Sequence, residues 1–236
     1  MKTVLITGAA KGIGKATALE FAKNGYNIVI NYLTSQTEAK ALEELIKQEY
    51  NVEVLTIEAD ITDEQAVINM INETAKHFNK IDVLINNAAY AKDNHYIDKS
   101  KAEFLRVLEV NVVGTFLVTK YAVQYMDNGT IINISSRDAL DTYTELSMDY
   151  CASKAGVNSL TQTFSLAVPN NKFISIMLPW VNTESIQEMF PEYLEIELKR
   201  TNQKRLLEPT EIATEVYKLV DNENIKSGYI KKLEVK

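Results

Sequence analysis

Cysteine and histidine are both scarce in this chain, which narrows the chemistry that it can support. A single cysteine, Cys151, excludes an internal disulfide, and the two histidines have no cysteine neighbours at a zinc-binding spacing. These counts favour a reducing compartment and chemistry without a metal. We interpret Cys151 as a small side chain of the core, since only Lys154 is placed to lower the pKa of its thiol.

Long apolar runs, basic clusters and low-complexity linkers are missing as well. No apolar stretch approaches the ~18 residues of a membrane-spanning helix, and the N-terminus lacks a cleavage-type segment. A net charge of −7 without a cluster of basic residues opposes contact with a phosphate backbone. Eight glycines and four prolines leave little material for a linker. We therefore expect a cytoplasmic protein of one domain, residues 1–236, that binds neither nucleic acid nor membrane.

The chain does contain a regular alternation of strand-like and helix-like segments. Short runs rich in β-branched residues alternate with stretches whose apolar residues recur at helical period. The runs are residues 4–6, 28–30, 52–57, 83–85, 131–134 and 173–178. Runs so continuously apolar are typical of strands buried on both faces, which predicts a doubly wound parallel sheet in a three-layer α/β fold. Ligands of such sheets bind at the carboxyl ends of the strands.

A glycine-rich turn follows the first strand and precedes an amphipathic helix, which is the setting of a dinucleotide site. Gly8 allows the tight turn, Gly12 lets main-chain amides approach a pyrophosphate, and Gly14 allows close packing of the helix. The N-terminus of that helix favours negative charge. A glycine-rich turn that binds nothing is the competing interpretation.

The end of the second strand distinguishes the two nicotinamide dinucleotides, because an acidic side chain there binds the free ribose hydroxyls of NAD(H). Residues 31–35, which begin with Asn31, contain no carboxylate. Lys11 offers a cation, and Thr34 and Ser35 offer hydroxyl donors. NADP(H) is therefore the predicted cofactor.

The end of the third strand should approach the other end of the cofactor. Asp60 and Ile61 stand there and are expected beside the adenine. Asp60 has an alternative role as a helix cap, because Asp63 and Glu64 follow it.

Tyr150 and Lys154 are four residues apart, so a helix would place them on one face. Tyrosine has an ordinary pKa of about 10, and a fixed cation beside it should draw that pKa toward neutrality. Ser136 ends a buried strand, where its hydroxyl could hydrogen-bond a carbonyl oxygen. Taken alone, such a Tyr–Lys pair is usually a surface pair, and Ser136 is equally suited to a turn.

Taken together, these segments resemble the short-chain dehydrogenase/reductase family, and in particular its 3-oxoacyl-acyl-carrier-protein reductases, over essentially the whole chain. The matching motifs are TGAAKGIG from Thr7, NNAA from Asn86, YCASK from Tyr150, the spacing of Pro179, Val181 and Thr183, and RLLEPTEIA from Arg205. The resemblance implies a Rossmann-like sheet of seven parallel strands. It also implies an oxidoreductase that transfers hydride between NADP(H) and a carbonyl or alcohol.

The resemblance assigns roles to individual residues. A catalytic tetrad is carried over onto Asn111, Ser136, Tyr150 and Lys154, in which Lys154 also holds the nicotinamide ribose and Asn111 anchors a proton-relaying water. The complete set of expected cofactor contacts is Gly8, Lys11, Gly12, Ile13, Gly14, Asn31, Thr34, Ser35, Asp60, Ile61, Asn87, Ala88, Tyr150, Lys154, Pro179, Val181 and Thr183. From its place in an apolar helix alone, Asn111 is as readily interpreted as structural.

Some positions depart from the family pattern. Ala89 and Trp180 stand where glycine is usual, and the indole would narrow the nicotinamide end or form a flat wall for substrate, or else cover the core. His95, after the fourth strand, is a weakly supported substrate contact. The segment before Tyr150 should repel anionic substrates through its acidic residues, which are Asp138, Asp141, Glu145 and Asp149.

Three functions compete at this point. The preferred one is reduction of a free ketone, aldehyde or keto-ester. Reduction of a 3-oxoacyl group on acyl carrier protein is the alternative, although Asp127-Asn128 and Asn170-Asn171 stand where basic residues would steer an acidic carrier. A nucleotide-binding sensor or scaffold without turnover belongs to another class, and the intact tetrad argues against it.

Two long helical segments, roughly 100–124 and 149–168, should flank the later strands, and residues 183–204 suit a lid over the substrate. The two segments carry more apolar residues than one sheet-facing stripe needs, which predicts a partner surface. The apolar residues considered in the two segments are Phe104, Leu105, Leu108, Val112, Phe116, Leu117, Val157, Leu160 and Phe164. In the family these helices pair across a two-fold axis, and a second interface uses the last strand and a glycine-rich tail. Because the sequence stops at Lys236, we expect a homodimer, with a homotetramer as the alternative.

Overall fold

The structure, a computed structural model, describes residues 1–235. Within them, seven parallel strands form one sheet in the order β3-β2-β1-β4-β5-β6-β7. The strands are β1 (Thr3–Ile6), β2 (Asn27–Tyr32), β3 (Val54–Glu58), β4 (Val83–Asn86), β5 (Thr130–Ser136), β6 (Lys172–Leu178) and β7 (Tyr229–Lys232). The predicted doubly wound α/β sheet is confirmed.

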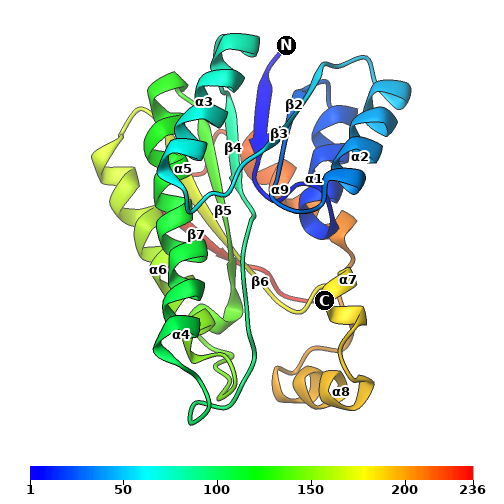
Figure 1. The fold of residues 1–236 in the computed structure, drawn as a ribbon, viewed down its shortest axis with the longest axis vertical. Coiled ribbons are helices and arrows are strands. Elements are labelled where there is room, and N and C mark those ends of the chain that lie inside the picture. Colours follow the sequence, from blue (N-terminus) through cyan, green and yellow to red (C-terminus); the bar gives the residue numbers. More distant parts are fainter. Residues whose placement is uncertain (236) are drawn as a thin grey trace.

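Helices cover both faces of the sheet (Figure 1). On one face lie α1 (Gly12–Lys23), α2 (Gln36–Glu49) and α9 (Pro209–Asp221), and on the other α3 (Glu64–Phe78), α5 (Thr115–Ala122) and α6 (Met148–Ala167). Val4 and Ile6 of β1 pack into the core on the side of α1, α2 and α9, whereas Leu5 packs into the core on the side of α3 and α5. Because successive side chains of a strand point to opposite faces, strands buried on both sides are apolar at every position.

The helical segment after β4 is longer and less regular than a single helix. It comprises α4 (Lys101–Leu108), a π-helical turn η1 (Glu109–Gly114), α5, and a 3₁₀ turn η2 (Val123–Tyr125). It begins at Ser100, whose side chain forms a capping box with Glu103. A Cβ atom on Gly114 would lie 2.7 Å from Cδ1 of Ile61, so the absence of a side chain permits this close approach. The predicted span of 100–124 is close to the observed one, but the π-helical turn was not predicted.

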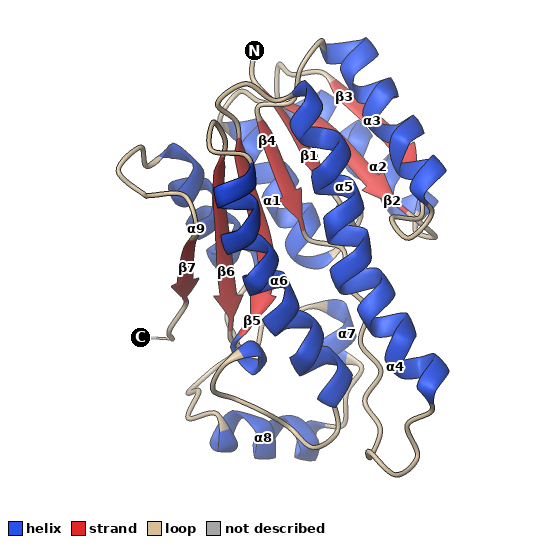
Figure 2. Cartoon of the chain, turned by 90° about the vertical axis from the view of Figure 1, so that its left-hand side faces the viewer, coloured by secondary structure: helices blue, strands red, loops and turns tan. Residues whose placement is uncertain are grey.

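Residues beyond the carboxyl ends of β5 and β6 form a layer of their own (Figure 2). They include a 3₁₀ turn η3 (Arg137–Ala139) directly after β5, and two helices after β6, α7 (Glu184–Gln187) and α8 (Pro191–Arg200). This arrangement puts the expected lid at the ligand-binding end of the sheet. None of the helices in residues 1–235 has the length and apolar character needed to cross a bilayer.

Candidate active site

The turn between β1 and α1 requires its glycines. Gly8 and Gly12 have φ angles of +61° and +51°, in the left-handed region that favours glycine. A Cβ atom on Gly14 would lie 2.5 Å from the main-chain oxygen of Gly8, so that side of the turn is closed by packing. The turn is a cradle in which main-chain amides can be approached closely, as a pyrophosphate requires.

A groove of about 880 Å³ extends from this cradle across the carboxyl ends of the strands. Its volume and its glycine cradle fit a dinucleotide. Most of the predicted cofactor contacts line it, namely Gly8, Lys11, Gly12, Ile13, Asn31, Thr34, Ser35, Asp60, Ile61, Asn87, Ala88, Tyr150 and Thr183. Lys154, Pro179 and Val181 line an adjoining cavity instead, while Gly14 serves the packing of α1.

Asn31 lines the groove but is buried and holds the backbone in place. Its Oδ1 accepts a hydrogen bond from the Gly8 amide (3.3 Å), and its Nδ2 donates to the Ala59 oxygen (3.1 Å). The strand continues to Tyr32, and the half-exposed Leu33 follows along the groove. Both residues belong to the segment 31–35 that was considered for cofactor choice, but they were not among the predicted contacts.

Lys11 is present in the groove, but a carboxylate already pairs with it. Its Nζ lies 2.8 Å from Oε1 of Glu38, and this hydrogen bond raises the pKa of Lys11, with smaller contributions from Glu184 and Glu188. Both partners of the pair are about half exposed, so exchange of Glu38 for a phosphate would cost little.

Asp60 lines the groove at the end of β3 and is not the cap of α3. Its Oδ1 accepts hydrogen bonds from the amide (2.9 Å) and hydroxyl (2.7 Å) of Thr62, and Arg106 lies 3.6 Å from its carboxylate. The cap is Asp63, which accepts from the Gln65 amide at 2.8 Å. Arg106 also lines the groove and was not predicted, because it comes from α4.

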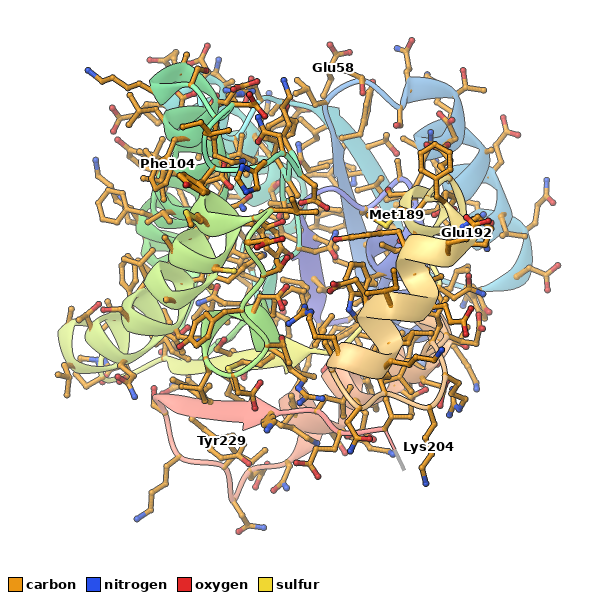
Figure 3. The ribbon with its side chains drawn as sticks, turned by 90° about the horizontal axis from the view of Figure 1, so that it is seen from below. Glu58, Phe104, Met189, Glu192, Lys204 and Tyr229 are labelled. Atoms are coloured by element: carbon orange, nitrogen blue, oxygen red, sulfur yellow. The ribbon has the colours of Figure 1, made fainter. Side chains whose placement is uncertain are left out.

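Ser136, Tyr150 and Lys154 line one cavity of about 250 Å³ that shares walls with the groove. Trp180 forms part of its apolar wall, in agreement with the expectation that the indole forms a wall of the substrate site. Met189 lies on the lid side of the opening, across from α6 and the loop that precedes it (Figure 3). The remaining wall includes Leu178, Tyr193 and Gln203, which come from β6 and the lid segment and were not predicted.

The ammonium group of Lys154 lies over the ring of Tyr150, 5.4 Å from its centroid, and donates a hydrogen bond to the Ile134 oxygen (2.8 Å). Burial lowers the pKa of Lys154 to about 8. Burial also raises the pKa of Tyr150, and the charges of Asp138 and Asp93 add to that rise. The expectation of a Tyr150 pKa drawn toward neutrality was therefore wrong, because burial and two carboxylates move the pKa in the opposite direction. A hydrogen bond with Ser136 opposes the rise without reversing it.

Asn111 lies in the π-helical turn and ties three segments together. Its Nδ2 donates to the Tyr90 oxygen and the Ser153 hydroxyl, both at 2.9 Å, and its Oδ1 accepts from the Tyr90 amide at 2.7 Å. The Ser153 hydroxyl donates in turn to the main-chain oxygen of Tyr150 at 2.7 Å. The Asn111 side chain thus holds the N-terminal part of α6 against the loop after β4, and its predicted role in proton relay stays a prediction.

Of the four acidic residues before Tyr150, only Asp138 lines the cavity. Asp149 is fully buried and forms an ion pair with Lys99 (2.8 Å), while Asp141 pairs with Arg137 and Lys232. Glu145 is exposed outside the cavity. The expectation that all four repel an anionic substrate was therefore wrong for three of them, whose charges are paired or point elsewhere.

The loop after β4 contributes a different residue from the one expected. His95 does not line the cavity, and its ring lies against that of Tyr96 instead. Asp93, two residues earlier, reaches both the cavity and the groove, where its carboxylate accepts a hydrogen bond from the Ser147 hydroxyl. The loop therefore adds negative charge rather than an imidazole.

Comparison with known proteins gives consistent results. The sequence model described as short chain dehydrogenase matches residues 2–193. Glucose 1-dehydrogenase 2 of Bacillus subtilis is 31% identical over 230 residues, which are 94% of this chain and 88% of that protein. The 3-oxoacyl-acyl-carrier-protein reductase FabG of Staphylococcus epidermidis is 37% identical over 166 residues, 69% of this chain and 67% of that protein. A dehydrogenase/reductase from Sinorhizobium meliloti has a similar structure, with a TM-score of 0.92 at 25% identity over 98% of this chain and 93% of that chain.

Proposed function

The chain belongs to the short-chain dehydrogenase family, whose members are oxidoreductases that act on CH–OH groups with a nicotinamide cofactor, and we propose that it reduces a carbonyl group of a small molecule with NADPH. A ketone, aldehyde or keto-ester is the substrate class. The observation that carries the proposal is the convergence of Ser136, Tyr150 and Lys154 on a cavity that adjoins the dinucleotide-sized groove.

The residues divide the chemistry between them. When bound, the reduced nicotinamide supplies the hydride that is added to the carbonyl carbon. The phenol of Tyr150 donates the proton to the carbonyl oxygen, and the Ser136 hydroxyl hydrogen-bonds that oxygen as negative charge develops on it. Because the pKa of Tyr150 is raised, the phenol stays protonated at neutral pH and is ready to act as an acid. This protonation state favours reduction over alcohol oxidation.

NADP(H) is proposed over NAD(H) because residues 31–35 carry no carboxylate that would repel a 2′-phosphate. Lys11 would bind that phosphate by exchanging its surface partner Glu38. Thr34 and Ser35 line the same end of the groove and offer hydroxyl donors.

The similarity to FabG of Staphylococcus epidermidis favours a second candidate, reduction of a 3-oxoacyl group on an acyl carrier protein. The surface offers little steering charge for an acidic carrier, since Asp127, Asn128 and Asn170 are exposed and not basic. Asn171 is buried and accepts a hydrogen bond from the Gly129 amide (2.7 Å), so it belongs to the fold and not to that surface. We therefore keep the free carbonyl compound as the proposed substrate.

We also propose that residues 1–236 act as one catalytic domain in a cytoplasmic homodimer. One continuous sheet supports the single domain, and the free Cys151 supports a reducing compartment. The apolar surface on the outer side of α4, α5 and α6 supports the dimer.

Replacement of Tyr150 by Phe tests the proposal. Y150F removes the transferable proton and keeps the ring, so kcat/KM for any accepted ketone should fall by about 10²–10⁴-fold. The Kd for NADPH should change little. The matched control is Tyr143→Phe in the neighbouring loop, since Tyr143 is 64% exposed and does not line the cavity. Absorbance of NADPH follows turnover, and full activity of Y150F would contradict the proposed role.

A further inference from the structure

Asp138 is the one carboxylate of the loop after β5 that reaches the cavity. The 3₁₀ turn η3 folds it back over Ser136, whose hydroxyl donates to Oδ2 of Asp138 and accepts from its amide, both at 3.1 Å. Thr142 donates its hydroxyl to the other carboxylate oxygen, Oδ1, at 2.5 Å. The acid is thus hydrogen-bonded to the group that is proposed to hold the substrate carbonyl.

From this contact we propose that Asp138 recognises the substrate by accepting a hydrogen bond from a hydroxyl group on the carbon next to the reacting carbonyl. The preferred substrates are then hydroxyketones and hydroxyaldehydes. This inference rests on the proposed carbonyl reduction and names the substrate class of the same cavity.

The Ser136 hydroxyl has a single proton to donate. In the structure this proton is directed at Oδ2 of Asp138. When a substrate carbonyl takes the hydrogen bond, Oδ2 is left as a carboxylate oxygen without a donor inside a cavity. An oxygen of this kind is costly to leave unpaired, more so than a neutral acceptor. A substrate hydroxyl beside the carbonyl replaces the lost donor, because Ser136 and Asp138 bind adjacent positions.

The surrounding charges do not satisfy Asp138 in another way. The guanidinium of Arg200 on α8, whose charge acts on Asp138, is held by Glu197, with distances of 3.0 and 3.1 Å from its Nε to the two carboxylate oxygens. Its Nη1 donates to the main-chain oxygens of Thr142 (3.1 Å) and Tyr143 (2.7 Å). Arg200 therefore lends Asp138 a distant charge and no hydrogen bond among the described residues.

The other titratable groups around Asp138 come from α6, from the loop after β4, from α8 and from the turn η3 itself. They are Tyr150 and Lys154 of α6, Asp93 of the loop after β4, Tyr193 of α8, and the neighbouring Arg137, which pairs with Asp141. Burial raises the pKa of Asp138, which shows that these groups leave the carboxylate short of stabilising partners. A substrate hydroxyl would supply one.

The same carboxylate selects against two kinds of substrate. A simple alkyl ketone takes the Ser136 hydrogen bond and leaves Oδ2 unpaired. A 2-oxo acid brings a second carboxylate next to Asp138 and Asp93, where like charges repel each other. The cavity wall is otherwise mainly apolar, with Leu178, Trp180 and Met189 among its residues, and it accommodates the carbon skeleton.

Three compounds with the same ethyl ketone part test the inference: 1-hydroxy-2-butanone, 3-pentanone and 2-oxobutanoate. They differ in whether the carbonyl carries a CH₂OH, an ethyl or a carboxylate group. We expect wild-type kcat/KM with NADPH to be about tenfold or more higher for the hydroxyketone than for 3-pentanone, and lowest for the oxo acid. Asp138→Leu should bring the ratio of the first two close to one.

Two further variants separate recognition from structure. Asp138→Asn keeps the shape and an acceptor oxygen, so it should keep part of the preference for the hydroxyl and lose the discrimination against 2-oxobutanoate. Asp141→Asn is the matched control, because Asp141 lies three residues along the same loop and, unlike its ion-pair partner Arg137, does not line the cavity. It should keep the wild-type order of the three substrates.

A binding measurement makes the test independent of turnover. Trp180 is the only tryptophan and forms part of the cavity wall, so its fluorescence reports ligand binding. In Y150F with NADP⁺ bound, 1-hydroxy-2-butanone should bind about tenfold more tightly than 3-pentanone, and the added D138L change should abolish the difference.

The outcomes distinguish the two proposals. Equal use and equal binding of the hydroxyketone and 3-pentanone would overturn the role of Asp138 and leave carbonyl reduction standing. The same holds if D138L keeps the wild-type preference. If neither these compounds nor a wider set of ketones is reduced with NADPH or NADH, and none changes Trp180 fluorescence, the proposed function fails and takes the inference with it.

Discussion

The ammonium group of Lys154 is almost fully buried, and its hydrogen-bond acceptor among the described residues is a main-chain oxygen, that of Ile134. Burial without a counter-ion disfavours the charged form, which is why the pKa falls to about 8 from an ordinary value of 10.5. The proposed reaction nevertheless needs a cation beside Tyr150. We infer that the fold is destabilised at this position for the benefit of the chemistry.

Replacement of Lys154 by Met should therefore stabilise the protein while it abolishes activity. The folded pKa is lower than the unfolded one, so between about pH 8 and 10.5 the unfolded chain binds more protons and wild-type stability rises with pH. Below pH 8 the full cost of the buried charge is present. K154M should then be more stable by about 1–3 kcal/mol, and this advantage should shrink as the pH rises through the window.

Thermal or urea unfolding of the cofactor-free protein at several pH values measures this difference. Lys76→Met on α3 is the control, because Lys76 is exposed and its substitution should give no comparable trend. A K154M variant that is less stable than wild type at pH 7 would mean that the hydrogen bond to Ile134 outweighs the cost of burial.

At the scale of residues, the sequence predicts contacts between side chains that are close along the chain. Tyr150 and Lys154 are four residues apart on one helix, so their juxtaposition could be predicted. The burial of Asp149 could not, because its partner Lys99 is separated from it by 50 positions in the sequence. The raised pKa of Tyr150 was missed because its largest cause is burial, and because Asp93, one of the charges that add to the rise, comes from a distant loop.

At the scale of elements, the position of the end of β2 determines which of residues 31–35 can be altered to test cofactor choice. The strand ends at Tyr32, so Asn31 lies within it, and neighbouring side chains of a strand point to opposite faces. An acid at position 31 would therefore replace an amide that donates to the Ala59 oxygen, and would damage the fold before it affected cofactor choice. Leu33, 47% exposed along the groove, is the better position to alter.

Cofactor preference should respond to charge at Leu33 in opposite directions. Leu33→Arg adds a cation where the 2′-phosphate is expected and should lower the Kd for NADPH by about tenfold, since a charged hydrogen bond contributes about 1.5 kcal/mol. Leu33→Asp should raise that Kd by a similar factor. The Kd for NADH should change much less in L33R, because NADH lacks the phosphate.

Titration calorimetry with both dinucleotides checks this, and each variant serves as the control for the other. Wild-type protein that binds NADH more tightly than NADPH would contradict the proposed cofactor. Equal changes for the two dinucleotides would show that the phosphate does not lie beside Leu33.

The order of the elements could be predicted, but their internal irregularities could not. Continuous apolar runs identified most of the strands, and helical period identified the segment that begins at Ser100. The π-helical turn at Glu109–Gly114 left no trace in that period. The π-helical turn coincides with the close approach of Gly114 to Ile61, which is a contact between segments that are distant in sequence.

At the scale of the whole molecule, the helices on the α4 to α6 side serve two surfaces. Of the apolar residues on these helices, Leu117 and Val157 are buried within the molecule. Leu105 and Phe116 remain 50% and 39% exposed, and the ring of Phe116 lies against that of Phe164 with 5.9 Å between centroids. Figure 3 shows Phe104 on the opposite side of the molecule from the lid residue Met189. A partner on this surface would leave the cavity open.

Replacement of Phe116 by Glu should convert the proposed homodimer into a monomer. Near a two-fold axis the introduced carboxylates would face apolar residues and each other, and an unpaired charge is costly to bury. Leu45→Glu on α2 is the matched control, because Leu45 is 38% exposed, close to the 39% of Phe116, but lies on the other side of the sheet. Light scattering at micromolar concentration should give twice the mass of one chain for wild type and L45E, and the mass of one chain for F116E. A monomeric wild type, or a dimer that persists in F116E, would show that α4, α5 and α6 do not form the interface.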